Sequence, residues 1–346
     1  MRDTMKMAIS LDDILLEPQY SEIDSRLDTS VKTRLTTKKK LEIPIMATNM
    51  STITEYDMMK TMSDLGGVAC LHRFLPNSER LDIVRKAYKT GVKPIMASIG
   101  VGDKEYSMGV ELIQAGADIL LIDVAHAHSK GVFDQLNNFQ VFRKNIDIIV
   151  GNIATKEAAA QFLAVGVDGL RIGIGPGSRC LTRTVTGHGV PNATALLGVR
   201  AARTEYAKNT GAYVPLIMDG GLRTSGDIVK ALYIGADVAC LGGMLAGTEE
   251  TPGQIVKNGG GLHKKFYGMA SKDAMEIHGK GKPGIAAEGF SELVPYQGSV
   301  RPIVEEIVGG IRSGLSYTGA KTIAELRQKG RPMLLSQAAQ YESKIR

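Results

Sequence analysis

One short segment of the sequence has the residue types of a nucleophilic catalytic loop. Residues 173–183 read Gly-Ile-Gly-Pro-Gly-Ser-Arg-Cys-Leu-Thr-Arg and place Cys180 after three glycines within five residues. Glycine lets a backbone take unusual dihedral angles or approach a ligand closely. Because this cysteine loop follows an apolar run, we expect the Cys180 thiolate to act as a nucleophile; a buried small residue is the alternative. Cys70 and Cys240 lie inside apolar runs, which predicts buried strand residues.

Two other loops have paired glycines. Gly220-Gly221 follows Asp219, and Gly242-Gly243 follows another apolar run. Backbone N–H groups in such loops can donate to a phosphate, although each pair alone is also typical of a tight turn. The Ser178 hydroxyl could add a donor, and the Asp219 carboxylate could accept hydrogen bonds from ribose hydroxyls.

Two histidines follow Asp123. For Asp123 itself, an ordinary strand-end carboxylate that caps the next turn is the alternative to a functional role. A His-x-His pair, His126 and His128, could indicate a metal site, but no further ligand stands at the usual spacing. The segment is therefore predicted to be a loop that contacts substrate or cofactor. His188 is expected to make only a local hydrogen bond.

Short apolar runs at regular intervals predict the fold. Continuous rather than alternating apolar residues are typical of parallel strands buried on both faces. Three junctions repeat a Gly just past a helix end and then an Asp that opens a strand, at residues 115–118, 165–168 and 234–237. Eight strands with crossovers predict a (β/α)8 barrel; the alternative, an open doubly wound sheet, lacks an early Gly-x-Gly-x-x-Gly turn. The predicted strands are residues 43–47, 67–71, 94–98, 118–124, 147–151, 168–173, 214–219 and 237–242.

The segments around the barrel receive separate predictions. Helical periodicity marks residues 78–90, 156–165 and 225–234, and two further helices are expected at 300–314 and 322–330. Residues 1–42 should cap one end of the barrel. Residues 248–296, a long polar flap after the eighth strand, should lie at the face where barrel enzymes place their sites, with mobile glycine-rich stretches at 259–261 and 279–284. The prediction is a single catalytic domain spanning residues 1–346.

Composition excludes some classes and leaves one question open. A hydrophobic content of 43% is too high for a disordered chain, and three cysteines cannot form a disulfide framework. No apolar run has the length of a membrane span, and no signal-peptide core follows the N-terminus, so a cytoplasmic protein is predicted. The net charge of +6 suits either a nucleic-acid surface or an anionic small substrate. The tight run Lys38-Lys39-Lys40 is interpreted as a solvated turn.

Together these motifs resemble the IMP dehydrogenase/GMP reductase family. The resemblance extends from Leu-Asp-Asp-Ile-Leu-Leu-Glu-Pro at 11–18 to Gly-Gly-Ile-Arg-Ser at 309–313, and the segment 173–189 resembles the family's catalytic cysteine loop. It implies a (β/α)8 barrel, a purine nucleotide (GMP or IMP), a nicotinamide cofactor and a homotetramer. A membrane partner is not expected, and nucleic acid is disfavoured.

Several features favour the reductase branch. Only 22 residues separate Leu71 from Pro94, so the CBS modules that dehydrogenases insert there are absent, and residues 269–288 lack the Arg-Tyr pair of a dehydrogenase flap. Residues 49–50, 242–247 and 266–271 look reductase-like, whereas 126–131 and 293–298 look dehydrogenase-like. Leu181 and Arg73 depart from the usual family residues. The resemblance thus implies GMP reductase; the alternatives are an IMP dehydrogenase without CBS modules and, less favoured, a non-catalytic nucleotide- or nucleic-acid-binding barrel.

The resemblance also implies roles for individual residues. Cys180 would attack C2 of GMP, Glu288 and Thr182 would protonate the departing ammonia, and NADPH would reduce the adduct to IMP. Asp123 and Arg73 complete the implied catalytic set, and Asp123, Ala125 and Thr182 the cofactor contacts. A potassium ion on the backbone carbonyls of Gly175, Gly177 and Cys180 is possible by analogy. The implied substrate contacts are Met50, Asn152, Ser178, Asp219, Gly220, Gly221, Gly242, Gly243, Tyr267, Gly268 and Met269.

Overall fold

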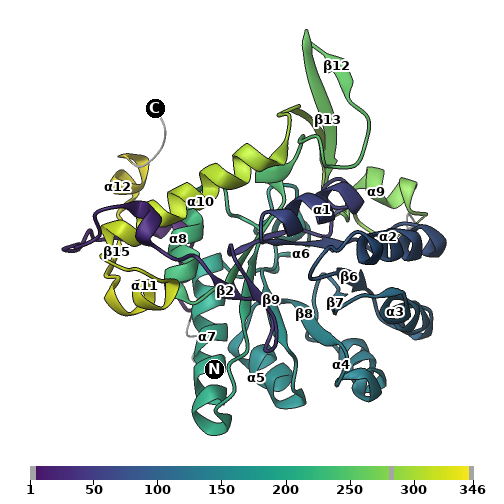
Figure 1. Cartoon of the computed structure of the whole chain (residues 1–346), viewed down its shortest axis with the longest axis horizontal. Helices are drawn as coiled ribbons and strands as arrows, with labels where there is room; N and C mark the ends of the chain where they lie inside the picture. Colours follow the sequence, from purple (N-terminus) through teal and green to yellow (C-terminus); the bar gives the residue numbers. More distant parts are fainter. Residues whose placement is uncertain (1–4, 280–283, 343–346) are drawn as a thin grey trace.

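The eight predicted strands form a closed parallel barrel at the centre of the molecule (Figure 1). The computed structural model describes residues 5–279 and 284–342. Strands pair in the order β10-β11-β4-β5-β6-β7-β8-β9, and β9 pairs with β10 to close the ring. The predicted (β/α)8 barrel is confirmed. Its strands are β4 (Ile45–Ala47), β5 (Val68–Leu71), β6 (Met96–Ile99), β7 (Ile119–Asp123), β8 (Asp147–Ile153), β9 (Gly169–Ile172), β10 (Leu216–Asp219) and β11 (Val238–Leu241).

Helices surround this barrel and connect its strands. The connection from β5 to β6 contains α2 (Asn77–Lys89) and no inserted domain, as predicted. α5 (Lys156–Val165) and α8 (Ser225–Ile234) coincide with their predicted ranges. Within the described part of the chain, no helix is both long and apolar enough to cross a membrane. The other helices here are α1 (Tyr56–Asp64), α3 (Asp103–Ala115), α4 (Lys130–Asn138), α6 (Thr182–Thr186) and α7 (Asn192–Thr210).

A hairpin from the N-terminal region closes one end of the barrel. Its strands β2 (Thr33–Arg34) and β3 (Lys40–Leu41) flank Leu35, which is fully buried in the same cluster as the strand residues that point into the barrel. The predicted cap is thus confirmed for this hairpin. The lysine turn is less solvated than expected, because Lys38 Nζ lies 2.8 Å from the buried Asp147 carboxylate and Lys39 Nζ 3.8 Å from it.

The repeated Gly-x-Asp junctions stabilise that same end. Their glycines, Gly116, Gly166 and Gly235, all have positive φ, as the prediction required. The aspartate that follows each glycine accepts a backbone N–H near the start of the preceding barrel strand. The donors are Ile95 to Asp118 (2.8 Å), Ile148 to Asp168 (2.9 Å) and Leu216 to Asp237 (2.8 Å). The sequence repeat therefore links adjacent strands where their regular ladder begins.

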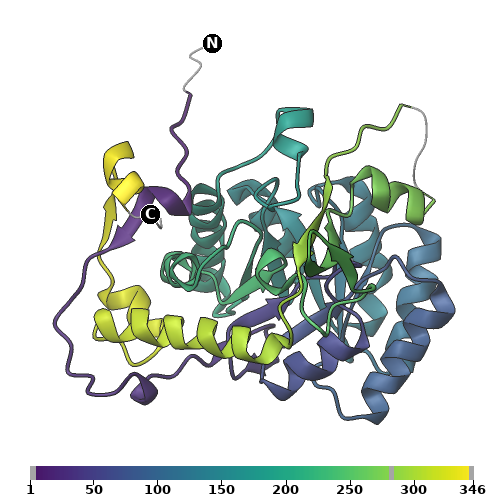
Figure 2. The ribbon, with the colours of Figure 1, turned by 90° about the horizontal axis from the view of Figure 1, so that it is seen from above.

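A strand near the start of the described chain and one near its end pair on one flank of the barrel. β1 (Ile14–Leu16) pairs antiparallel with β15 (Pro332–Leu334), and Figure 2 shows the two terminal segments side by side. The predicted C-terminal helices are α10 (Val300–Tyr317) and α11 (Ile323–Lys329). β15 and the last helix, α12 (Gln337–Glu342), have no counterpart in the prediction.

The flap contains a small sheet rather than only a polar loop. β12 (Val256–Asn258), β13 (Gly261–Tyr267) and β14 (Ser291–Pro295) form an antiparallel sheet whose β12–β13 hairpin projects from the body in Figure 1. α9 (Lys272–Ile277) lies between β13 and β14. Of the glycines expected to be mobile at 259–261, Gly259 and Gly260 form the hairpin turn and Gly261 begins β13. Of the second glycine-rich stretch, residues 280–283 lie outside the described residues.

Asp237 offers a test of the junction hydrogen bonds, because its buried carboxylate also forms ion pairs with two arginines. Its oxygens lie 2.9 Å from a guanidinium nitrogen of Arg203 and 3.0 Å from one of Arg327. We expect Asp237→Asn to lower the free energy of unfolding by about 3–5 kcal/mol, since it strands buried positive charge. Asp118→Asn is the matched control, because that side chain is 38% exposed; it should cost about 1 kcal/mol. Urea unfolding measures both, and equal losses would contradict the special role of Asp237.

Candidate active site

A cavity of about 670 Å³ opens at the carboxyl ends of the barrel strands. This is the face at which barrel enzymes bind their substrates, and the volume lies in the range of small-molecule sites. Residues that end or follow β4, β5, β7, β8, β9, β10 and β11 line it, together with part of the flap. Every predicted site residue except Tyr267 is among the lining residues.

Cys180, Thr182 and Glu288 form a chain of hydrogen bonds in this cavity. The Cys180 thiol donates to Thr182 Oγ1 at 3.1 Å, and the Thr182 hydroxyl donates to Glu288 Oε2 at 2.7 Å. All three side chains line the cavity and are half-buried. The arrangement can move a proton from the thiol to the carboxylate, or from the carboxylate outward, through one hydroxyl.

The backbone fixes this chain of side chains. Leu181 N–H donates to the Glu288 carbonyl at 2.6 Å, and Glu288 N–H donates to the Ala270 carbonyl at 2.9 Å. An antiparallel bridge joins Cys180 to Gly289. The cysteine loop and the flap therefore pair like strands, which brings together residues that lie more than a hundred positions apart in the sequence.

A buried arginine lies at the floor of the cavity. Arg171, on β9, donates to Asn49 Oδ1 (2.8 Å), Thr48 Oγ1 (3.0 Å) and Asp123 Oδ1 (2.9 Å), and lies 3.1 Å from Asp219 Oδ2. Burial alone would lower the pKa of Arg171, but the carboxylates around it, Asp219 foremost, hold that pKa above its ordinary range. The guanidinium thus fixes the two acidic side chains at the ends of β7 and β10.

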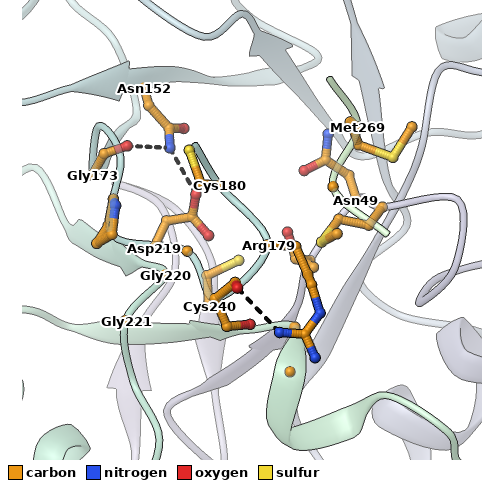
Figure 3. Close-up of a pocket in the computed structure, with 18 of the residues that line it drawn as sticks. Asn49, Asn152, Gly173, Arg179, Cys180, Asp219, Gly220, Gly221, Cys240 and Met269 are labelled. Carbon is orange, nitrogen blue, oxygen red and sulfur yellow. Dashed lines mark hydrogen bonds between the residues drawn. The ribbon is translucent and has the colours of Figure 1, made fainter. Parts of the chain in front are cut away.

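Asn152 and Asp219 form a hydrogen-bonded part of the cavity wall. Asn152 Nδ2 donates to the Gly173 carbonyl and to Asp219 Oδ2, each at 2.7 Å (Figure 3). Asn152 Oδ1 is buried and has no hydrogen-bond partner among the described residues. A buried acceptor without a donor is costly, so this oxygen favours a ligand that donates a hydrogen bond here.

The glycine pairs lie on the cavity wall as predicted. Ser178, Gly221 and Gly243 all line it. Asn192 Nδ2 donates to the Gly220 carbonyl at 2.9 Å and so holds the Gly220-Gly221 loop. Met50, Gly268 and Met269 line another part of the wall. Tyr267 does not line the cavity; its hydroxyl instead lies 3.1 Å from Ser51 Oγ.

The expected cofactor residues gather beside the end of β7. Asp123 lies between two cations, because its Oδ1 receives Arg171 and its Oδ2 lies 3.6 Å from Arg73 Nε. Phe74, whose ring is 4.9 Å from the Arg73 guanidinium carbon, also lines the cavity, as does Ala125. An apolar ring beside an ordered cation and carboxylate is suited to a planar, polar heterocycle.

Cys70, Cys240 and His188 have the surroundings that the sequence predicts. Cys70 and Cys240 are buried strand residues, and burial raises the pKa of both thiols, with the Asp219 carboxylate adding to the increase at Cys240. Cys240 touches the cavity, but its raised pKa disfavours a thiolate. His188 Nδ1 lies 2.7 Å from the Thr186 carbonyl, the local contact that was predicted.

The His126–His128 segment gives no sign of a metal site. His128 Nε2 lies 3.1 Å from Gln161 Oε1. Across residues 5–279 and 284–342, no group of three or more His, Cys, Asp or Glu side chains could hold an ion.

Sequence reasoning missed several residues of this site. Arg171 is the chief one, although an arginine inside an otherwise apolar strand was a usable signal, since a buried charge requires counter-charges. Asn49 was noted only as part of a motif, and nothing in the pattern singled out Asn192. The other unpredicted lining residues include Thr48, Phe74, Arg179, Leu222, Arg223, Met244 and Phe266.

Comparison with known proteins identifies the family. A family model described as the IMP dehydrogenase / GMP reductase domain matches residues 8–346. An inosine-5'-monophosphate dehydrogenase of Cryptosporidium parvum is 33% identical over 388 residues, covering 97% of this chain and 94% of that protein. A GMP reductase of Vibrio vulnificus (strain YJ016) is 32% identical over 336 residues, covering 95% of each.

A solved structure agrees with the sequence comparison. A GMP reductase from Trypanosoma brucei, a cysteine-to-alanine variant in complex with guanosine 5'-monophosphate, superposes with a TM-score of 0.89 at 29% identity, covering 99% of this chain and 98% of that one. Enzymes with these two names are oxidoreductases that use a nicotinamide dinucleotide. Relatives of both names have nearly equal identity to this chain. The chain is a member of the IMP dehydrogenase/GMP reductase family.

Proposed function

We propose that the protein is a GMP reductase, which converts GMP to IMP and ammonia at the expense of a reduced nicotinamide dinucleotide. The observation that carries the proposal is the hydrogen-bond chain from Cys180 through Thr182 to Glu288. Removing an amino group from a purine requires a nucleophile at carbon and a proton at the departing nitrogen. This chain of three side chains offers both within one cavity.

Substrate binding follows from the walls of the cavity. The N–H groups of the glycine pairs and the Ser178 hydroxyl would donate to the phosphate, and Asp219 would accept the ribose hydroxyls. Arg171 holds Asp219 in place, so that carboxylate needs little reorganisation on binding. The unpartnered Asn152 Oδ1 would accept a donor of the bound nucleotide. Met50 and Met269 would pack against the purine.

The deamination step moves one proton from the Cys180 thiol to the departing amino nitrogen. As the Cys180 sulfur bonds to C2, the π electron pair of the C2=N3 bond moves to N3, and the thiol proton passes through Thr182 to the Glu288 carboxylate. Glu288 then gives the proton through Thr182 to the 2-amino nitrogen, the pair on N3 re-forms the C2=N3 bond as the bond to the amino nitrogen breaks, and ammonia departs. The purine remains attached to sulfur as a thioimidate with a C2=N bond, ready to be reduced.

A reduced nicotinamide, when bound, supplies a hydride to C2. The residues beside β7 fit such a group, because Phe74 offers a ring face and Asp123 an ordered carboxylate near the Arg73 charge. Expulsion of the sulfur from the reduced carbon then frees IMP and leaves the Cys180 thiolate, which takes a proton from solvent to restore the thiol. We propose NADPH as the cofactor, with contacts from Asp123, Ala125 and Thr182.

The remaining proposals rest on family resemblance and supply no chemical step. They are a homotetramer, a cytoplasmic location, and one catalytic domain spanning residues 1–346 with the flap at 248–296. The backbone carbonyls of Gly175, Gly177 and Cys180 are proposed for a potassium ion. All three residues line the cavity, and the Gly177 carbonyl also accepts the Cys180 N–H at 3.0 Å, which leaves it a second lone pair.

The second candidate is an IMP dehydrogenase without CBS modules. It is supported by relatives of that name with nearly equal identity and by the dehydrogenase-like residues at 126–131 and 293–298. That reaction ends in hydrolysis, which requires a base to activate water. Residues 269–288 contain neither arginine nor tyrosine, so the Arg-Tyr pair that the resemblance implies for dehydrogenases is missing there.

A paired absorbance assay distinguishes the two candidates. We expect the absorbance of reduced nicotinamide to fall when the protein is mixed with GMP and NADPH, and to stay constant with IMP and NAD⁺. Ammonia released in the first mixture should equal the NADPH consumed. A change confined to the second mixture would make the protein a dehydrogenase, and no change in either would favour a non-catalytic barrel.

Substitutions of the hydrogen-bond chain test the proposed proton path. Glu288→Gln and Thr182→Val should each lower kcat about 10²-fold to 10³-fold and change the KM for GMP little, because general acid catalysis acts in the transition state. Glu276→Gln is the matched control, since this exposed flap carboxylate lies on α9. Steady-state ammonia release measures all three, and unchanged turnover in Glu288→Gln would refute the assignment.

A further inference from the structure

Arg179 directly precedes Cys180, yet the proposed reaction gives it no task. Its side chain reaches from the cysteine loop to the flap, where it pairs with Glu292 on β14. A second nitrogen of the same guanidinium donates to the Ser178 carbonyl at 3.1 Å, a bond drawn in Figure 3. Arg179 thus connects the two segments that carry Cys180 and Glu288.

Two aromatic rings enclose this guanidinium. Its central carbon lies 4.9 Å from the ring centre of Phe266 and 5.1 Å from that of Phe290. A cation over the face of an aromatic ring is attracted by the ring's quadrupole, and more strongly where water is excluded. The Arg179 side chain is only 16% exposed, whereas Glu292 is 46% exposed. The aromatic pair therefore shields the arginine, and the carboxylate closes the outer side.

The backbones approach closely at the same point. Phe290 N–H donates to the Arg179 carbonyl at 3.3 Å. A Cβ atom added at Gly268 would lie 2.6 Å from that carbonyl oxygen, and one added at Gly289 would lie 2.9 Å from it. Side chains at these two positions would push the flap away. The flap sequence thus permits the backbone contact, and the Arg179 side chain adds a second attachment beside it.

We propose that Arg179 is a clasp that fastens the flap to the cysteine loop and thereby positions Glu288 against Thr182. In the sequence, Glu288 lies between α9 and Phe290. Movement of the flap away from the cysteine loop at Phe290 would therefore also move the Glu288 carboxylate away from the Thr182 hydroxyl. Arg179 acts in this way through Glu288 and is a positioning residue. The activity part of the proposal rests on the proposed reductase function, whereas the clasp itself does not.

The reactivity of Cys180 tests the clasp without any nucleotide. Iodoacetamide labels exposed thiols, and Cys70 and Cys240 are buried, so labelling should report on Cys180, with Cys180→Ala as the blank. We expect Arg179→Met and Glu292→Gln to raise the labelling rate about threefold to tenfold, as flap contacts of this strength open locally. Glu292→Gln changes a half-exposed side chain and should leave folding intact.

A matched control removes a different ion pair of the flap. Lys265 on β13 pairs with Asp273 of α9 and does not reach the cysteine loop. Lys265→Met should therefore leave the labelling rate of Cys180 unchanged. If Arg179→Met and Glu292→Gln also label at the parent rate, no clasp exists, whatever reaction the protein catalyses.

A double-mutant cycle tests the action through Glu288. Arg179→Met should lower kcat about tenfold in the parent protein, a loss typical of a misplaced catalytic group, and should lower it no further in Glu288→Gln. Equal losses in both backgrounds would overturn the positioning role. An increase in the KM for GMP with kcat unchanged would also overturn it, because it would make Arg179 a substrate-binding residue.

Discussion

The hydrogen bond from Thr182 to Glu288 is the contact on which the proposed chemistry depends. It joins the cysteine loop to a flap that lies more than a hundred residues later, and neither segment alone contains a complete proton path. Strand-like backbone pairing, from Leu181 to Glu288 and from Cys180 to Gly289, sets its geometry. The flap is thus part of the site itself, and whatever holds the flap also controls how the Cys180 proton reaches the departing amino group.

The barrel supplies the fixed side of the same cavity. Arg171 replaces apolar packing at the top of the barrel with a charged cluster that holds Asp123 and Asp219. A buried guanidinium costs free energy unless its counter-charges are in place, so the cluster is ordered before any ligand arrives. At the opposite end, Asp237 and its two arginines do similar work for stability alone. One fold therefore uses buried ion pairs at both ends for different purposes.

The sequence predicted those parts of the molecule that depend on local patterns. Continuous apolar runs and Gly-x-Asp junctions locate all eight barrel strands, and the family resemblance assigns Cys180, Thr182 and Glu288 to one site. Non-local features escaped. β1 and β15 pair across three residues each and are far apart in the chain, and the flap strands alternate too little to be distinguished from a loop. Arg171 was missed because its partners are on other strands, and Tyr267 was expected in the cavity but turns towards Ser51.

The central claim is that GMP becomes covalently bound to Cys180 as it loses ammonia. Peptide mapping by mass spectrometry tests this most directly, on protein mixed with GMP and a substoichiometric amount of NADPH and quenched with acid within one turnover. The account predicts a purine nucleotide, lacking the 2-amino group, on the peptide that contains Cys180, and its disappearance when excess NADPH is added. Ammonia release with no nucleotide on that peptide, or with the nucleotide on Cys70 or Cys240, would contradict it.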